Sequence, residues 1–382
     1  MRARKGCAEQ CENIFFAFRS TEAIRLFRRI EIPSANLRNI DQFNEWPSDA
    51  IVAEIKRHIK ETSNPCSWWG HSHTPPPADA VVYYVDEFDV PAPKNVSRVA
   101  ACPCCSPNHA KYKLRGKIAW FPNEKVIRLI GPICFQAINA QGHEEAERDL
   151  KRRKKIRQEI EIIRDFGKII PAMIKMIEHV LPIASDLDRF MFDLNRVFDE
   201  APSERMPRHV MDGVLKVSVI FNAPFIKPDG SISTRQQERF EQFGRLDGYS
   251  MLDRSGKPTA EKLTKMLIGL DSIAKKLEAT SNVAGLDEHE RHRISIKLPE
   301  CKETLLSIVK ELASRQRFLV SNDIQLLDRW GRHHGAPVSL GITRERSDVS
   351  VTLKPRRGAE IHKVVVIGRN ATGNLPDLVL AT

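Results

Sequence analysis

The side chains best suited to chemistry are cysteines, and three of them, Cys102, Cys104 and Cys105, lie within four consecutive positions. Cys102 and Cys105 have C-x2-C spacing, which lets a single turn direct two thiolates toward one ion. Thiolates and imidazoles are typical ligands of zinc, which binds four of them in a tetrahedron. A chain of 382 residues with eight cysteines is not typical of a small disulfide scaffold, so the cluster favours a metal site.

A second pair of ligands is needed to complete such a site. Cys134 follows a predicted β-hairpin and stands at the predicted start of a helix, where the helix dipole favours the thiolate form. His143 lies nine residues further on, and His109, close behind the first cysteines, is the alternative. Four protein ligands would make the zinc structural, because a catalytic ion keeps an open position. The predicted ligands are Cys102, Cys105, Cys134 and His143.

This order of parts, a cysteine knuckle, a hairpin and then a ligand at a helix start, resembles the treble-clef class of zinc fingers. The resemblance covers residues 102–143 and implies a small structural zinc module. The sequence departs from the pattern of that class because Cys134 and His143 are widely separated, whereas the second ligand pair is normally close together. The departure leaves the choice between His143 and His109 open.

A second group of candidate ligands precedes the first. Cys66, His71 and His73 form a C-x4-H-x-H pattern in a stretch rich in turn residues. Cys7 and Cys11, spaced i and i+4, would face the same side of a helix and could complete a second site. This site requires residues 7–11 and 66–73 to meet in space, and the alternative is a polar loop without a metal.

Basic residues are concentrated beside the predicted metal site. Residues 100–157 contain thirteen Lys or Arg and five acids, and so supply +8 of the net charge of +11. Such a patch is typical of a protein that binds a polyanion, although a solvated helix face is the alternative. We expect phosphate contacts to DNA or RNA without sequence specificity. The expected contact residues are Lys111, Lys113, Arg115, Lys117, Lys151, Arg152, Arg153, Lys154, Lys155 and Arg157.

Hydrophobic periodicity predicts an α+β protein that is mainly helical and multidomain, with a small zinc-binding β-hairpin module. Helices are predicted at residues 48–60, 143–165, 185–198, 235–243, 259–278, 302–319 and 321–330. Strands are predicted at residues 80–85, 111–121, 125–130, 214–221, 349–353 and 363–367. Pro171 and Pro182 are expected to break or kink the helical region around them.

Five segments follow from the composition shifts and proline-rich boundaries. They are an N-terminal α+β domain (1–95), a zinc-binding module (96–145), a helical connector (146–205), a mainly α domain (206–334) and a C-terminal β segment (335–382). No run approaches the roughly 18 apolar residues of a membrane helix, so no membrane partner is expected. The basic N-terminus lacks a long apolar run, and we expect a cytoplasmic protein.

Signatures of common enzymes are missing from the sequence. It contains no GxxxxGK[ST] phosphate loop, no GxGxxG turn, no GxSxG elbow and no HExxH motif. We therefore expect a zinc-stabilised nucleic-acid-binding protein rather than an enzyme. The second hypothesis is a scaffold whose long helices bind protein partners or self-associate, and the third is a nucleic-acid-processing enzyme.

Overall fold

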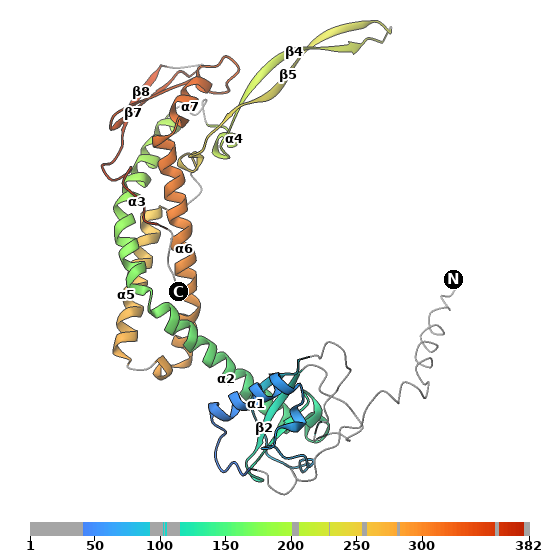
Figure 1. Cartoon of the computed structure of the whole chain (residues 1–382). Helices are drawn as coiled ribbons and strands as arrows, with labels where there is room; N and C mark the ends of the chain where they lie inside the picture. Colours follow the sequence, from blue (N-terminus) through green and yellow to red (C-terminus); the bar gives the residue numbers. More distant parts are fainter. Residues whose placement is uncertain are drawn as a thin grey trace. The chain divides into compact units, whose positions relative to one another are not determined.

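The computed structural model describes residues 41–91, 102, 104, 115–200, 206–228, 230–253, 258–280, 283–355 and 359–377. The chain divides into two compact units, residues 1–157 and 158–382, and each is described by itself (Figure 1). Helices and three small antiparallel sheets are both present in the described residues, which confirms the α+β class. Among these residues, no helix is both long enough and apolar enough to cross a membrane.

The first unit is built on a three-stranded antiparallel sheet in the order β1-β2-β3. Its strands are β1 (Tyr83–Asp89), β2 (Arg115–Phe121) and β3 (Val126–Ile130). The predicted hairpin is confirmed for the described residues, while residues 111–114 lie outside them. Helix α1 (Asp49–Thr62) begins at Ser48, whose hydroxyl accepts a hydrogen bond from the Ile51 N–H, as an N-cap should.

Short elements connect the helices and strands of this unit. The 3-10 turn η3 (Pro65–Ser67) follows α1, whereas η4 (Cys134–Ala137) links β3 to helix α2 (Ala140–Gly167). One apolar core joins α1, the sheet and the first turns of α2, with Ile55, Tyr84, Ile118, Phe135 and Leu150 among its buried members. Three thiols of the candidate metal centre described below belong to this core or pack against it, namely Cys102, Cys134 and Cys104.

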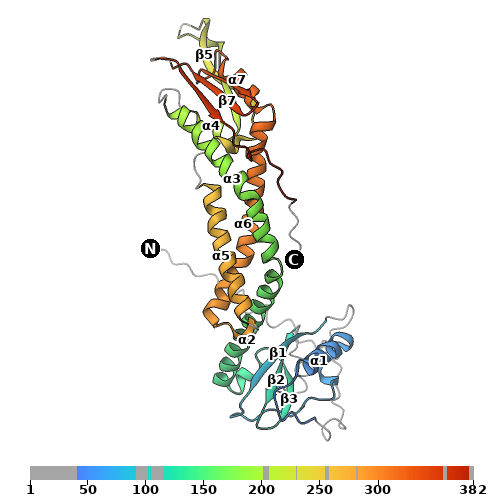
Figure 2. The same ribbon diagram turned by 90° about the vertical axis from the view of Figure 1, so that its left-hand side faces the viewer.

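The second unit contains three long helices that lie side by side (Figures 1 and 2). They are α3 (Ile170–Asp199), α5 (Thr259–Ala279) and α6 (Glu288–Val320). Two sheets accompany them: the ribbon of β4 (Val214–Ile226) and β5 (Ile232–Arg245), and the sheet of β6 (Leu340–Glu345), β7 (Asp348–Leu353) and β8 (Ile361–Val366). The shorter elements are α4 (Arg208–Met211), η6 (Tyr249–Met251), η7 (Val283–Gly285) and α7 (Asp323–Gly331).

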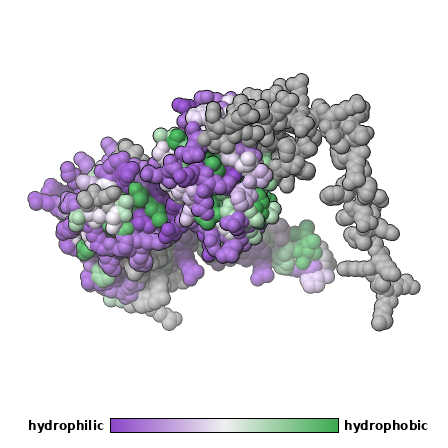
Figure 3. All heavy atoms as spheres, turned by 90° about the horizontal axis from the view of Figure 1, so that it is seen from below, coloured by the Kyte–Doolittle hydropathy of each residue, from purple (hydrophilic) through white to green (hydrophobic). Residues whose placement is uncertain are grey.

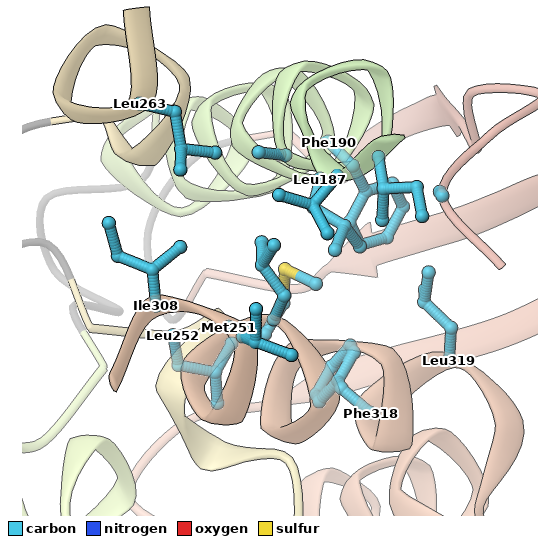
Figure 4. Packing of buried hydrophobic residues seen from close by; sticks show 14 of the residues in the cluster. Leu187, Phe190, Met251, Leu252, Leu263, Ile308, Phe318 and Leu319 are labelled. Atoms are coloured by element: carbon cyan, nitrogen blue, oxygen red, sulfur yellow. The ribbon is translucent and has the colours of Figure 1, made fainter. Parts of the chain in front are cut away.

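Buried side chains from distant segments meet in the core of this unit. Figure 4 shows Leu187 and Phe190 of α3 above Met251 and the side chains of α6, such as Phe318. The chain at η6 comes very close to α6, because a Cβ built on Gly248 would lie 2.2 Å from the backbone nitrogen of Phe318. Only glycine allows this approach, so position 248 fixes how the loop after β5 packs on the helix.

Several predicted elements differ from those observed. The helix predicted at 235–243 is wrong: these residues belong to β5, which pairs with β4 along its whole length. Pro182 does not break its helix but lies inside α3, whereas Pro171 stands in the first turn of that helix, where proline is tolerated. Strand β6 was not predicted.

The domain division is also coarser than the five predicted segments. A single core in the second unit includes Met173, Leu270 and Val351, which come from the predicted connector, α domain and β segment respectively. The first unit likewise joins the predicted N-terminal domain and zinc module through one core. Neighbouring segments in each unit therefore bury their apolar faces against one another.

Candidate metal centre and basic surface

Two thiols, those of Cys104 and Cys134, gather around the sulfur of Cys102. The Cys104 and Cys134 side chains hydrogen-bond to this sulfur and, with the Gly131 N–H, lower the pKa of Cys102 to about 3, although burial opposes the shift. The Gly131 N–H lies 3.3 Å from Sγ of Cys102. Because Gly131 directly follows β3, the end of this strand holds Cys102 in place, and Cys134 begins the turn η4 that follows.

The loop that carries His71 lies along the free edge of β3. The Ser72 N–H donates to the Ile127 carbonyl across 2.8 Å, and His71 forms a parallel bridge with Ile127. His71 is fully buried, and its ring is stacked against Trp68 with 6.3 Å between the ring centroids. A segment that was predicted as a separate site is therefore attached to the same strand that holds Cys102.

Two buried histidine nitrogens in this loop have no hydrogen-bond partner among the described residues. They are Nδ1 of His71 and Nε2 of His73, and the two rings lie 4.1 Å apart between centroids. Burial and the neighbouring His73 lower the pKa of His71 to about 3, while the negative charge of the nearby Cys102 acts in the opposite direction. Buried polar atoms without a partner are costly. A neutral imidazole with an unused nitrogen beside thiols is the kind of donor that zinc takes.

We call Cys102, Cys104, Cys134 and His71 the thiol–imidazole cluster. In the part of the chain that the structure describes, no set of three or more His, Cys, Asp or Glu side chains is arranged to hold a metal ion. Cys102 and Cys134 of the predicted ligand set do come together. Predicted ligands and alternatives that lie outside the described residues are Cys7, Cys11, Cys105 and His109.

His143 occupies a different position from the one its predicted role requires. It lies in the first turn of α2, and its Nδ1 is 2.6 Å from the hydroxyl oxygen of Tyr84. Burial lowers the pKa of His143, and burial also raises the pKa of Tyr84, so both groups are neutral near pH 7. The negative charges of Cys104, Glu147 and Cys134 also contribute to raising the pKa of Tyr84.

Cys104 and His71 are the two members of the cluster that the sequence did not assign to this site. The C-x2-C spacing from Cys102 led to the prediction of Cys105, whereas Cys104 lies only two residues after Cys102. No other sequence signal distinguishes between these adjacent thiols. The C-x4-H-x-H pattern drew attention to His71 but gave no indication of its neighbours. The bridge between His71 and Ile127 is a tertiary contact, so the sequence alone could not reveal it.

Lys117 is buried in the structure and does not face a phosphate. Its side chain is only 4% exposed, and its Nζ pairs with Glu147 and lies 3.5 Å from a carboxylate oxygen of Glu87. The ammonium also lies 4.8 Å from the centroid of the Tyr84 ring. We therefore leave Lys117 out of the proposed nucleic-acid surface, because it neutralises acids inside the first unit.

Part of the basic run on α2 is paired in the same way. Lys154 pairs with Glu87 and lies 3.7 Å from Asp86, and Arg157 lies 3.8 Å from Asp86. Arg153 donates to the backbone carbonyl oxygens of Tyr84 and Val85. These three cations fasten the helix to β1, and Arg153 and Lys154 are only partly exposed, whereas about half of the Arg157 side chain stays in solvent.

Lys151 and Arg152 are among the well-exposed residues of the run. The side chains of Lys151 and Arg152 are 74% and 64% exposed, and their nearest acids, Glu147 and Asp149, lie 3.6 and 3.8 Å away. Exposed pairs at such distances contribute little energy and are readily exchanged for a phosphate. Arg115 is similarly exposed opposite Asp89, whereas Lys111 and Lys113 lie outside the described residues. Lys155 also lies on the exposed side of α2.

No family of known proteins, no curated protein and no solved structure matches this chain. Any proposal of function therefore depends on the residues of this chain alone. They form two groups: the buried thiol–imidazole cluster and the exposed cations of α2. Among the coloured residues in Figure 3, hydrophilic ones predominate.

Proposed function

We propose that this chain is a zinc-stabilised nucleic-acid-binding protein, in which the first unit holds the metal and presents cations to the phosphate backbone. The observation that carries the metal is the meeting of three thiols at Cys102 beside the buried, unpartnered Nδ1 of His71. Thiolates with one imidazole form a ligand set that suits structural zinc. Bound zinc would supply structural stability, since a four-ligand site leaves no position for a substrate.

The polyanion contact is proposed for the exposed side of α2. Lys151 and Arg152 face solvent, whereas Cys102, Cys134 and His71 of the thiol–imidazole cluster are buried. The two groups would therefore have different roles. Lysine and arginine contacts to phosphate position a protein on DNA or RNA and do not read the bases. The metal and the basic surface are therefore independent parts of the proposal, and either part can fail without the other.

The metal is tested by elemental analysis of the purified full chain. We expect about one equivalent of zinc in the wild type and a loss of most of it in Cys102→Ser. Cys301→Ser is the matched control, because Cys301 is also a buried cysteine but belongs to α6 in the second unit. Wild-type protein that holds less than about half an equivalent of zinc would contradict the proposal.

Nucleic-acid binding is tested by the absorbance of the purified protein and by anisotropy of labelled DNA and RNA. We expect a raised 260/280 ratio that falls after a high-salt wash, because released counterions make phosphate binding strongly salt-dependent. Labelled duplex DNA and RNA should show affinity that declines as salt rises. Absence of binding to both at low salt would contradict this part of the proposal and leave the zinc assignment intact.

A protein-interaction role is the second candidate, favoured by one specific observation. The long helices of the second unit bury their apolar faces against one another, but the ribbon of β4 and β5 exposes large apolar side chains. Exposed apolar groups of this kind are typical of binding surfaces.

A further inference from the structure

A cavity of about 610 Å³ lies between α7 and β6 in the second unit. The helix and the strand touch where a Cβ built on Gly331 would collide with the carbonyl oxygen of Leu340. Further along, the Ile342 N–H donates to a carboxylate oxygen of Asp328 across 2.9 Å. The cavity is lined by the end of α6, by α7 and by the second half of β6. Its volume falls within the roughly 300–1,000 Å³ that small-molecule sites occupy.

Three exposed arginines line this cavity. Arg329 belongs to α7, Arg344 to β6 and Arg346 to the turn that follows β6. Nε of Arg344 lies 3.5 Å from the carbonyl oxygen of Arg346, so the strand and the turn keep these two residues close together. Within the described ranges of the chain, none of the three guanidinium groups forms an ion pair with a carboxylate.

The acids near these arginines do not neutralise them. Asp328 also lines the cavity, but its carboxylate pairs with Arg332, whose Nε lies 3.0 Å away. Glu345 stands between Arg344 and Arg346 in the sequence, yet it is not among the described residues that line the cavity. Neighbouring side chains of a strand point to opposite faces, which explains this difference. The three arginines therefore give the cavity an excess of positive charge.

Apolar side chains form the inner wall of the cavity. Leu319 of α6, Ile324 of α7 and Ile342 of β6 line it and are buried in the core of the second unit. Val320 lines it as well and is 64% exposed. A bare inorganic anion would leave this wall in water, whereas a ligand with an organic part would cover it. The cavity therefore suits an anion that carries an organic group.

The chemistry of arginine narrows the class of anion. A guanidinium group forms two parallel hydrogen bonds with a phosphate, which gives geometric specificity as well as energy. The planar face of the same group stacks on nucleobases. Three guanidinium groups beside an apolar wall can therefore hold a phosphate and a flat ring system at the same time.

We propose that this cavity binds a nucleoside phosphate, with the phosphate on Arg329, Arg344 and Arg346 and the nucleoside against the apolar wall. The ligand is either a free nucleotide or one nucleotide of a nucleic-acid strand, because both present the same groups. The inference concerns the second unit and goes beyond the proposed function, which assigns the phosphate contacts to α2. It depends neither on zinc nor on the cations of α2.

Arg346 offers a variant that separates binding from folding. Its φ of +52° lies in the left-handed region, which glycine adopts without a steric penalty. Arg346→Gly therefore removes the guanidinium group and the backbone strain together, and its urea midpoint should stay close to that of the wild type. A loss of binding in this variant then reports the missing guanidinium group and not an unfolded protein.

The first test is isothermal titration calorimetry of the full chain with AMP up to about 1 mM, since a ligand of this size with ordinary efficiency binds at about 0.1 mM or tighter. Arg344→Gln and Arg346→Gly should each weaken AMP binding about tenfold or more, because each removes hydrogen bonds between charged groups. Arg293→Gln is the matched control: Arg293 is 56% exposed and lies near the opposite end of α6 from the cavity. Inorganic phosphate should bind more weakly than AMP, and equal affinity for the two would contradict a nucleoside phosphate as the ligand.

A second titration identifies the source of the nucleotide. It uses a labelled single-stranded thymidine oligonucleotide and a full chain with Lys151→Glu and Arg152→Glu, which lacks the proposed phosphate contacts of α2. Remaining affinity that falls on Arg344→Gln and Arg346→Gly would identify a strand as the ligand, whereas binding of AMP alone would identify a free nucleotide. If neither AMP nor the oligonucleotide binds through these arginines, the inference is overturned and the proposed function of the first unit is unaffected.

Discussion

The hydroxyl oxygen of Tyr84 lies 2.6 Å from Nδ1 of His143. If Tyr84 donates in this bond, the ring proton of the neutral imidazole is on Nε2, and neither nitrogen has a lone pair for a metal. His71, in contrast, keeps a buried Nδ1 for which the described part of the chain offers no hydrogen-bond partner. We therefore expect His71→Gln to lose most of its bound zinc and His143→Gln to retain it, as measured by elemental analysis.

Two comparisons keep this prediction specific. Tyr84→Phe removes the hydrogen bond to His143 and should leave the zinc content unchanged, because the phenol is not a ligand in the proposed site. His73→Gln reports on the neighbouring ring, whose centroid lies 4.1 Å from that of His71. Loss of zinc in His143→Gln together with full retention in His71→Gln would restore the ligand set predicted from the sequence.

The exposed cations of α2 lead to a second prediction. The double variant Lys151→Glu with Arg152→Glu should weaken binding to duplex DNA or RNA about tenfold or more, with similar effects on different sequences. Removal of two phosphate contacts should also reduce the slope of log K against log salt by about 2. Fluorescence anisotropy across a salt titration measures both quantities.

The control for this variant lies on α5 in the second unit. Lys265 and Lys275 are 67% and 72% exposed and, like Lys151, each lies within reach of an acid four residues earlier in the chain. Reversal of these two charges changes the net charge of the protein by the same amount. Equal weakening in the two double variants would mean that net charge alone, and not the surface of α2, attracts the nucleic acid.

The helices and strands with a strong apolar pattern were predictable from the sequence. The helix predicted at 259–278 is observed as Thr259–Ala279, because its apolar spacing and Pro258 mark both its face and its start. The failure at residues 235–243 has a physical cause. That segment is polar and largely exposed, so it carries no periodic signal, and its conformation is decided by hydrogen bonds to β4.

The candidate site was predictable only in its local parts. The hairpin placed Cys102 and Cys134 near the same strand end, since both flank β2 and β3 in sequence. The position of His71 depends on a loop that attaches to the edge of β3, and no local pattern encodes that contact. The neutralisation of Lys154 and Arg157 likewise depends on Asp86 and Glu87 of β1, which are distant in the sequence.

Asp86 gives a prediction about pH. Burial would raise the pKa of its carboxyl, but hydrogen bonds from Lys56 Nζ, at 2.6 Å, and from the Glu87 N–H hold the pKa below its usual value. A lowered folded pKa means that the carboxylate contributes stability fully above about pH 4. This contribution is lost as the pH falls through the lowered value. Asp86→Asn should therefore cost about 2 kcal/mol at pH 7.

The measurement is the urea midpoint of both proteins between neutral and acidic pH. The gap between wild type and Asp86→Asn should narrow as the pH falls below about 4, because the wild-type carboxyl becomes neutral. Asp89→Asn is the control, since Asp89 is highly exposed opposite Arg115. A gap that stays constant or widens in acid would contradict the assigned direction of the shift.

Arg315 and Asp188 provide the last prediction. Nη1 of Arg315 donates to a carboxylate oxygen of Asp188 across 2.6 Å, and the other carboxylate oxygen accepts from the Ala260 N–H at the start of α5. Both side chains are largely buried, and Asp188→Asn leaves the guanidinium with Glu311, at 2.5 Å, as its remaining charge partner. The loss of the charged hydrogen bond should cost about 1.5–3 kcal/mol. Loss of the exposed pair of Asp271 and Lys275 in Asp271→Asn should cost much less than this. The denaturant midpoints of Asp188→Asn and Asp271→Asn measure the two losses of stability. Equal losses would mean that the buried pair of Arg315 and Asp188 does not stabilise the packing of α3 on α6.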